Sequence, residues 1–177
     1  MVDSDRWLVR SGAPADIAGI SHVHTEASKA RYLADDLPEA VVASVVGERC
    51  SQERWESILE DASYKLHFLF VVEHDEEVVG FIDSGSEGDE PPQHVFMERL
   101  FVLPSMWGTG VAQALLRRFI EECVQRGCTH VSLWSAPSPR TRRFYEKSGF
   151  TFTGQAHDIE VLPGFPRPQY EYRLRLS

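Results

Sequence analysis

Two glycines separated by one residue lie at the junction of a predicted strand and a predicted long helix. Gly108 and Gly110 follow the apolar residues 94–103 and lie at the start of the amphipathic residues 109–126. Glycine lets the backbone approach a ligand closely, and the free N–H groups at a helix start favour phosphate oxygens. The pattern predicts a phosphate-bearing ligand, although a tight turn that merely requires glycine also explains it. A dinucleotide fingerprint and a P-loop are excluded, because their further glycine, acidic residue or Gly-Lys-Ser/Thr sequence is absent.

The charge of the chain is distributed unevenly around this turn. The net charge is −9, yet residues 98–147 carry eight Lys and Arg against four Asp and Glu, so this stretch is +4 and the rest is −13. This distribution favours a small polyanionic ligand in the second half and a cationic or neutral one elsewhere, while a solvated arginine face explains it equally well. The negative total argues against general nucleic-acid binding.

The elements that position the turn can be predicted from apolar periodicity, helix caps and turn residues. The predicted strands cover residues 7–10, 66–73, 78–83, 94–103, 130–135, 151–156 and 170–176. The predicted helices start near Pro14, Ser51, Thr109 and Ser138. Residues 33–47 fit no single element, and residues 84–92, rich in Ser, Gly, Asp, Glu and Pro, predict an exposed loop.

The second half has the clearest helix signals. Gly127 is a natural stop for the helix over residues 109–126, and Gly149 closes the one opened by Ser138-Pro139, with Phe150 folded back over its last turn. The apolar stripe of the longer helix is Leu115, Leu116, Phe119, Ile120 and Cys123. Antiparallel strands, a β-α-β crossover and a closing hairpin predict an α/β fold, with a mixed, mostly antiparallel sheet and helices on both faces.

The length of 177 residues suits one domain over residues 1–177, and neither a repeat nor an interdomain linker is found. The start, MVDSDRWLVR, has no apolar core typical of a secretory signal, and no apolar run is as long as a membrane span. Three cysteines without metal-site spacing indicate free thiols in a reducing compartment. We therefore expect a cytoplasmic protein without a membrane partner and without a metal.

Two motifs resemble those of the GNAT acetyltransferases. Residues 98–104 followed by residues 107–112 resemble motif A, in which Arg or Gln, two residues, Gly, one residue and Gly or Ala follow a strand. Residues 143–150 resemble motif B, which usually ends Phe-Tyr-Glu-Lys-x-Gly-Phe. The two motifs stand in the family's order at a fitting separation, and the order of elements agrees over nearly the whole chain. The resemblance implies a GNAT fold.

The resemblance also implies acetyl-CoA as the acyl donor and assigns its contacts. Backbone amides at the glycine turn would grip the pyrophosphate, namely those of Trp107, Gly108, Thr109, Gly110, Val111, Ala112 and Gln113. The backbone of Leu100, Phe101 and Val102 would pair with the pantetheine arm as an added strand, in a slot opened by the next strand, which splays away in the family. Trp107 departs from the usual Arg or Gln, Ser138 from an Asn that contacts the cofactor, and Thr141 from a small Ala.

Two residues are candidates for proton transfer in such a reaction. Glu98 is the candidate general base, because an alkylammonium with a pKa of about 10 must lose a proton before it attacks a thioester. Its alternation with Phe96 and Leu100 predicts a semi-buried side, and a structural carboxylate paired with an arginine is the alternative. Tyr145 is the candidate general acid for the leaving thiolate, with a core aromatic residue as the alternative.

Other reactive residues have simpler explanations. His22 and His24 lack a third ligand, so no metal site is expected, and Cys123 belongs to the apolar stripe. Cys128 could be a nucleophile, but no Cys-His pair is evident. His157, Asp158 and Glu160 are predicted in the loop before the last strand, where the family shapes its acceptor pocket, and residues 33–47 are a second candidate wall.

The predicted activity is transfer of acetyl from acetyl-CoA to a primary amine by direct attack in a ternary complex. A GNAT-like module that binds an acyl-CoA without turnover is the alternative, and a longer acyl donor is a third interpretation. The amine acceptor is not identified by the sequence; it could be a small molecule or a peptide. Domains of this kind often pair as homodimers through late strands, and the sequence leaves the oligomeric state open.

Overall fold

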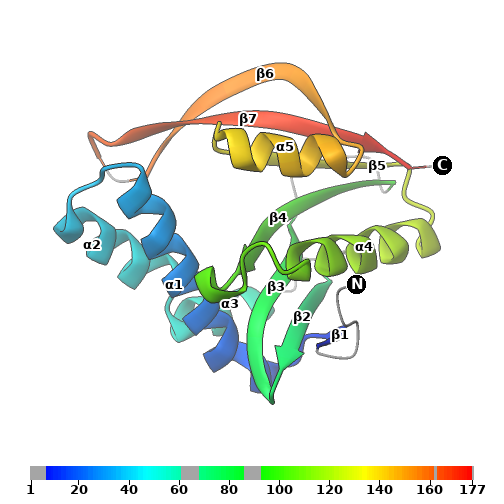
Figure 1. The fold of residues 1–177 in the computed structure, drawn as a ribbon, viewed down its shortest axis with the longest axis horizontal. Helices are drawn as coiled ribbons and strands as arrows, with labels where there is room; N and C mark the ends of the chain where they lie inside the picture. Colours follow the sequence, from blue (N-terminus) through cyan, green and yellow to red (C-terminus); the bar gives the residue numbers. More distant parts are fainter. Residues whose placement is uncertain (1–6, 61–67, 86–92, 162, 177) are drawn as a thin grey trace.

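The computed structural model describes residues 7–60, 68–85, 93–161 and 163–176. In this part of the chain seven strands form one sheet in the order β1-β2-β3-β4-β5-β7-β6 (Figure 1). The strands are β1 (Leu8–Ser11), β2 (Leu69–His74), β3 (Glu77–Gly85), β4 (His94–Val102), β5 (His130–Ser135), β6 (Thr151–Glu160) and β7 (Pro166–Arg175). Neighbours are antiparallel except β4 and β5, which are parallel. The predicted mixed, mostly antiparallel sheet is confirmed.

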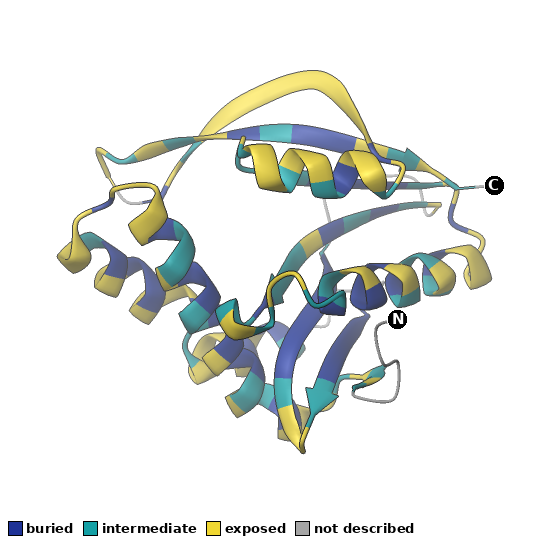
Figure 2. Ribbon diagram, in the orientation of Figure 1, coloured by how far each residue is buried: buried dark blue, intermediate teal, exposed yellow. Residues whose placement is uncertain are grey.

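Helices cover both faces of the sheet. The helices are α1 (Ile17–Ala34), α2 (Glu39–Arg49), α3 (Gln52–Glu60), α4 (Val111–Gln125) and α5 (Pro139–Lys147). Helices α4 and α5 share one core with the sheet, α1 and α3 pack on the opposite face, and α2 packs against α1. Figure 2 shows the buried side of α4 turned toward the sheet and its exposed side turned outward. Within the described ranges, no helix combines the length and the apolarity needed to cross a membrane.

The local signals read from the sequence act as predicted. The Ser51 and Ser138 hydroxyl oxygens accept hydrogen bonds from the N–H groups of Arg54 and Thr141, at 3.2 and 3.1 Å. Gly149 has a φ of +89°, and the following Phe150 is buried with its N–H bonded to the Tyr145 carbonyl at 3.0 Å. Such a helix end places the Phe150 ring beneath the last turn of α5, where it helps to fix Tyr145.

Three sequence predictions are corrected by the structure. Ser84 and Gly85 belong to β3 rather than to a loop. Ser84 is fully buried, and its hydroxyl oxygen is satisfied there by a hydrogen bond from the Phe68 N–H at 2.9 Å. The rest of the predicted loop, 86–92, lies outside the described residues. Residues 33–47 span the end of α1 and most of α2, which forms because Val42, Val45 and Val46 are buried in a cluster with Tyr32 and Val161.

The third correction concerns the last hairpin. His157, Asp158 and Glu160 were predicted in a loop but lie in β6, opposite Gln169, Pro168 and Pro166 of β7. Strand β6 is the outermost strand and nearly all of it is exposed, as Figure 2 shows. A strand without a buried face carries no apolar alternation, so its polar residues look like a loop in the sequence.

Strand β4 is paired along one edge and only briefly along the other. Strand β3 pairs with it from Phe96 to Val102, whereas β5 pairs with it only at His94, Val95 and Phe96. Beyond Phe96 the two strands separate, and β5 continues in its ladder with β7 (Figure 1). Among the described residues, no strand pairs with the β5-facing edge of β4 beyond Phe96. We call this separation the β4–β5 gap.

Candidate active site

The glycine turn lies where the sequence predicts, between β4 and the start of α4. Gly108 and Gly110 have φ values of +81° and +99°, which side-chain-bearing residues rarely adopt. A Cβ added to Gly108 would meet no atom within 4 Å. The Ala114 N–H is the first to bond within the helix, to the Gly110 carbonyl at 3.0 Å, so the three N–H groups before it have no helical acceptor. The turn therefore presents the Val111, Ala112 and Gln113 amides at a positive helix end, whereas the N–H groups of Trp107 and Thr109, predicted to bind with them, already bond to the Pro104 and Met106 carbonyls at 3.2 and 3.4 Å.

The three residues predicted to bind a pantetheine arm border the β4–β5 gap. Leu100 and Val102 pack into the core beneath α4, whereas Phe101 faces the other side, with its ring centroid 4.7 Å from that of His24. Their side chains thus anchor β4 in both layers. Among the described residues no strand pairs with the β5-facing edge here, although the Val102 carbonyl already accepts a hydrogen bond from the Trp107 indole at 3.0 Å.

Trp107 lies in the turn itself, and Ser138 lies at the start of α5. The Trp107 indole donates to the Val102 carbonyl at 3.0 Å, and the Arg140 guanidinium stacks 4.2 Å from the Trp107 ring centroid. Arg140 therefore holds a positive charge beside a turn in which the family pattern has Arg or Gln. The Ser138 hydroxyl donates to the Thr141 hydroxyl at 2.7 Å and caps α5. Arg140 is a site residue that motif comparison missed.

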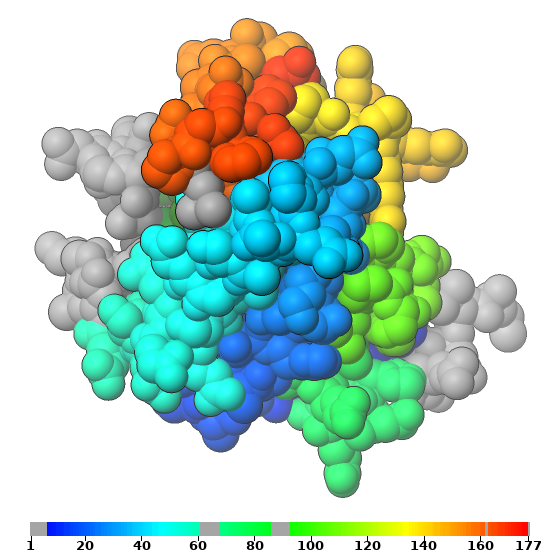
Figure 3. Space-filling model, turned by 90° about the vertical axis from the view of Figure 1, so that its left-hand side faces the viewer, coloured from blue at the N-terminus to red at the C-terminus, as the bar shows by residue number. Residues whose placement is uncertain are grey.

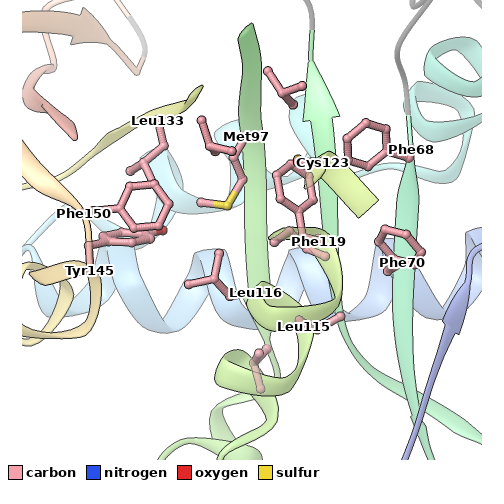
Figure 4. Close-up of a cluster of buried hydrophobic side chains, with 14 of the residues drawn as sticks. Phe68, Phe70, Met97, Leu115, Leu116, Phe119, Cys123, Leu133, Tyr145 and Phe150 are labelled. Carbon is pink, nitrogen blue, oxygen red and sulfur yellow. The ribbon is translucent and has the colours of Figure 1, made fainter. Parts of the chain in front are cut away.

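Tyr145 extends from α5 toward β4, next to Phe150 and above Leu116, as Figure 4 shows. Its ring contacts those of Phe144, Phe150 and Tyr172, with centroids 5.1–5.7 Å apart. The residue is only 7% exposed, and no described residue hydrogen-bonds to its hydroxyl. Burial raises the pKa of the phenol well above its ordinary value, an effect that the nearby Arg31 charge opposes. Tyr145 is therefore both a core residue and a neutral hydrogen-bond donor without a protein acceptor in the described chain.

Glu98 is the extra residue of a β-bulge. Asp83 of β3 pairs with Arg99 and the next residue, Ser84, pairs with Met97, so Glu98 has no residue opposite it. The Glu98 side chain is 39% exposed, more than the predicted semi-buried position, and its carboxylate lies 3.9 Å from the Arg99 guanidinium. The alternative role for Glu98, a structural carboxylate paired with an arginine, therefore agrees with part of this environment. The carboxylate lies against Gly85 of β3 and is partly exposed, two residues after the last β4 residue that pairs with β5.

A polar cluster that the sequence did not reveal lies next to Glu98. Arg99 bonds at 3.0 Å to Asp83, which is fully buried, and stacks 4.8 Å from the centroid of the Trp55 ring. His24 of α1 packs against the Trp55 ring, and burial lowers its pKa to about 3, with the charges of Arg99 and Arg49 acting in the same direction. His24 is therefore neutral at working pH. Only the tertiary fold brings these residues together, because they come from four separate elements.

Of the remaining candidates, only Gln113 belongs to the turn, through its backbone N–H. Cys123 and Cys128 are buried, and burial raises the pKa of both thiols, so Cys128 is not an activated nucleophile. His157 stacks on Trp134 with centroids 4.2 Å apart. Gln113 lines a hollow of about 500 Å³ between α4 and Ser148. Across the described ranges, no three His, Cys, Asp or Glu side chains are grouped to bind a metal ion.

Structures with this fold are known among N-acetyltransferases. The coenzyme A complex of PaiA N-acetyltransferase from Thermoplasma acidophilum is similar over 96% of this chain and 99% of that one, with a TM-score of 0.76 and 18% identity. An N-acetyltransferase from Staphylococcus aureus Mu50 is similar over 98% and 100%, with a TM-score of 0.77 and 19% identity. In sequence, an uncharacterised N-acetyltransferase of Mycobacterium tuberculosis is 29% identical over 116 residues, 64% of this chain and 69% of that protein. The model of the acetyltransferase (GNAT) family matches residues 31–150, and the chain belongs to this family.

Proposed function

We propose that the protein transfers the acetyl group of acetyl-CoA to a primary amine by direct attack within a ternary complex. The observation that carries this proposal is the β4–β5 gap, which begins beside Glu98 and Tyr145 and follows β4 to the glycine turn. A gap bordered by an unpaired strand edge suits an extended amide-bearing ligand, and open helix-start amides suit its phosphates. Holding both substrates together removes the need for an acyl-enzyme.

The residues of the turn fit coenzyme A as a substrate. The open space at Gly108 admits a ligand close to the backbone, and Arg140 adds a cation beside the amides. In this proposal residues 107–113 bind the pyrophosphate, the Leu100–Val102 backbone pairs with the pantetheine arm, and Ser138 contacts the donor from α5. The similar PaiA N-acetyltransferase was solved in complex with coenzyme A, which supports coenzyme A as the ligand.

Arg140→Ala is expected to weaken acetyl-CoA binding about tenfold, because a charge-assisted hydrogen bond to phosphate is lost. To reach a phosphate, the Arg140 guanidinium would give up its stacking on the Trp107 ring, and this loss is small because an exposed cation–π contact contributes only about 0.5–1 kcal/mol. Calorimetry at two salt concentrations measures the loss, which should shrink as salt rises. Arg142→Ala is the control on the same helix, because Arg142 is exposed and pairs with Glu146. Equal dissociation constants for Arg140→Ala and Arg142→Ala would show that Arg140 does not contact acetyl-CoA.

Glu98 and Tyr145 divide the proton transfers in this mechanism. The Glu98 carboxylate takes a proton from the incoming ammonium, directly or through water, and so exposes the nucleophilic lone pair. The Tyr145 hydroxyl donates to the thiolate sulfur as the carbon–sulfur bond breaks. The exposure of Glu98 and the burial of Tyr145 suit these roles, since the first must meet a solvated amine and the second a buried thioester.

Glu98→Gln is expected to lower kcat by about 10²-fold, within the range for a positioned base. The variant should also lose the rise in rate with pH on the acidic side of the profile, because only an ionised carboxylate accepts the proton. Acetyl-CoA affinity should stay within about twofold, since the carboxylate acts on the amine. Glu77→Gln, at the exposed start of β3, is the control. If Glu98→Gln keeps the parental pH profile, the Glu98 carboxylate has a structural role in the bulge and is not the general base.

The proposal as a whole is tested by an amine panel. The protein, acetyl-CoA and single amines are mixed, and free thiol is measured against reactions without amine. Thiol release that depends on an amine, with the acetylated amine found by mass spectrometry, supports the transferase. Tight binding of acetyl-CoA without turnover of any amine would instead support an acyl-CoA sensor.

A further inference from the structure

Two consecutive residues of β4, Glu98 and Arg99, both direct their side chains at strand β3. In a regular strand consecutive side chains point to opposite faces of the sheet, but the bulge at Glu98 breaks this alternation. Arg99 meets Asp83 and Glu98 meets Gly85, and these two residues of β3 share one face because they are two positions apart. The bulge thus brings a carboxylate and a guanidinium together, with 3.9 Å between the Glu98 Oε1 and the Arg99 Nη2.

The Arg99 guanidinium lies near two carboxylates, and among the described residues it donates a hydrogen bond to one of them only. Its Nη1 donates to Asp83 at 3.0 Å, whereas the 3.9 Å to Glu98 is too long for a hydrogen bond. The Asp83 side chain has no exposed surface, and that of Glu98 is 39% exposed. Charges attract more strongly away from water, so Asp83 holds the guanidinium more firmly than Glu98 does.

Arg99 is also held from the helix side of the sheet. Its guanidinium stacks 4.8 Å from the ring centroid of Trp55, a residue of α3 without exposed surface. Figure 3 shows the surfaces of α1, α2 and α3 (blue to cyan) adjoining one another on one side of the molecule. The Arg99 side chain is only 13% exposed. The aromatic ring and the buried carboxylate together fix where the positive charge lies.

The other ionisable groups of the described chain near Arg99 do not compete for this ion pair. Burial keeps His24 and Cys50 neutral, because it lowers the pKa of His24 to about 3 and raises that of the Cys50 thiol. The Arg49 guanidinium donates to two backbone carbonyls of the β6–β7 hairpin, at 3.3 and 3.1 Å. The charge balance beside Glu98 is therefore set by Arg99 and Asp83.

Gly85, the last residue of β3, leaves the space in which the Glu98 carboxylate lies. A Cβ added there would come within 2.6 Å of the Glu98 Oε2 and within 3.1 and 3.3 Å of its Cβ and carboxyl carbon. Contacts as short as 2.6 Å are not tolerated in a packed structure, so a side chain at this position would displace the carboxylate. The φ of Gly85 is not positive. Space, rather than backbone conformation, therefore favours glycine here.

We propose that Asp83 and Gly85 are positioning residues for the Glu98 carboxylate. Asp83 retains the Arg99 guanidinium, so the Glu98 carboxylate stays outside a tight ion pair and keeps the basicity that a proton acceptor needs. Gly85 provides the space that fixes where this carboxylate lies. The catalytic consequence rests on the proposed transferase function, to which this inference adds that β3 controls the base of the site.

Asp83→Asn tests the charge half of this proposal, because it removes the charge and keeps the shape. Released from Asp83, the Arg99 guanidinium can approach Glu98 and favour the ionised carboxylate. The pH midpoint at which the Glu98 carboxyl carbon titrates should therefore fall by about one unit, the lower end of the effect of a neighbouring opposite charge. Carbon NMR of protein labelled in its Glu carboxyl groups measures this midpoint without substrate, and Glu98→Gln assigns the signal. Asp75→Asn, at a side chain that is 89% exposed, is the control and should not move it.

Gly85→Ala tests the steric half. The displaced carboxylate should lower kcat by about 10–100-fold, the scale of a misplacement of about 1 Å, while acetyl-CoA affinity stays within about twofold. In a Glu98→Gln background the same change should cost less than about twofold, because the carboxylate that it displaces is absent. Gly19→Ala is the control: its Cβ would lie 2.8 Å from that of Val78 near the start of β3, so it crowds the core similarly and should leave kcat unchanged.

Unaltered titration of Glu98 in a folded Asp83→Asn protein would overturn the role of Asp83. A loss for Gly85→Ala that is equally large with and without Glu98 would overturn the role of Gly85. Circular dichroism verifies that each variant folds, and Gly85→Ala decides alone if Asp83→Asn does not.

Failure of the proposed function would show separately, as a Glu98→Gln enzyme with the parental pH profile or as no turnover of any amine. The NMR titration then decides about positioning, because it follows the Glu98 carboxyl group without catalysis. A lowered midpoint in Asp83→Asn, with a changed chemical shift of the Glu98 carboxyl carbon in Gly85→Ala but not in Gly19→Ala, supports positioning. Parental midpoint and chemical shift in both variants overturn it.

Discussion

Tyr145→Phe is expected to lower kcat by roughly 10²–10⁴, the usual scale for a positioned acid or base. The change keeps the ring and its contacts with Phe150 and Tyr172 and deletes only the hydroxyl. Because no described residue hydrogen-bonds to that hydroxyl, the folded protein loses little stability. The defect should lie in kcat rather than KM, since the bond to sulfur strengthens as the thiolate forms. Steady-state kinetics with the best amine of the panel measure it.

Two further measurements separate the catalytic from the packing role of Tyr145. An acyl donor with a more acidic thiol needs less assistance, so the variant should recover rate with it. The raised pKa also has a stability consequence: the fold favours the neutral phenol, so this contribution is complete below pH of about 10 and is lost as pH rises further. In Tyr145→Phe the free energy of unfolding should therefore fall less steeply as pH rises above about 10. Tyr172→Phe, in the same buried cluster, is the control for kcat only, because burial raises the pKa of Tyr172 as well. If Tyr145→Phe has the parental kcat, Tyr145 is a core residue without a catalytic role.

Gly110→Val is expected to weaken acetyl-CoA binding by about 100-fold or more. A branched side chain is strained at a φ of +99°, and forcing the turn toward negative φ would redirect the amides at the start of α4. A relaxed turn would no longer aim several N–H groups at one phosphate, and each charge-assisted bond lost weakens binding further. Calorimetry with acetyl-CoA, together with circular dichroism to verify the fold, measures the effect.

The chain offers a matched control for this change. Gly154 lies in β6 with a φ of +89°, and a Cβ there would meet nothing within 4 Å. Gly154→Val therefore imposes a similar backbone strain far from the turn and should leave acetyl-CoA affinity unchanged. If Gly110→Val binds acetyl-CoA as tightly as Gly154→Val, the turn is only a tight turn and the phosphates bind elsewhere.

Local signals in the sequence predicted one half of the site. The glycine turn, the stripe of α4 and the Gly149 stop each depend on residues within one or two helical turns, so their geometry can be read from spacing. Tyr145 follows from the same helix end, because Phe150 fixes the last turn above it. The long-range half could not be predicted in this way. The bulge at Glu98 depends on how β4 pairs with β3, and that register is a property of two strands rather than one.

The acceptor side shows the same limit more strongly. His24 looks like an ordinary polar residue of an amphipathic helix, and only the packing of α1 on the sheet places its ring against Phe101 and Trp55. Helix α2 was missed because its valines are poor helix formers, which become helical when buried against Val161. Tertiary burial thus overrode local preference in the segment that the sequence offered only as a candidate acceptor wall.

The short ladder between β4 and β5 has a mechanical consequence. Three residue pairs form the ladder between strands β1–β4 and strands β5–β7, whereas the ladders within each group are longer. The molecule can thus be regarded as two plates with a hinge at the start of β4. Glu98 is carried by the first plate and Tyr145 by the second. A relative movement of the two plates would change the distance between Glu98 and Tyr145, the pair to which the proposed mechanism assigns the proton transfers, without breaking a ladder inside either plate.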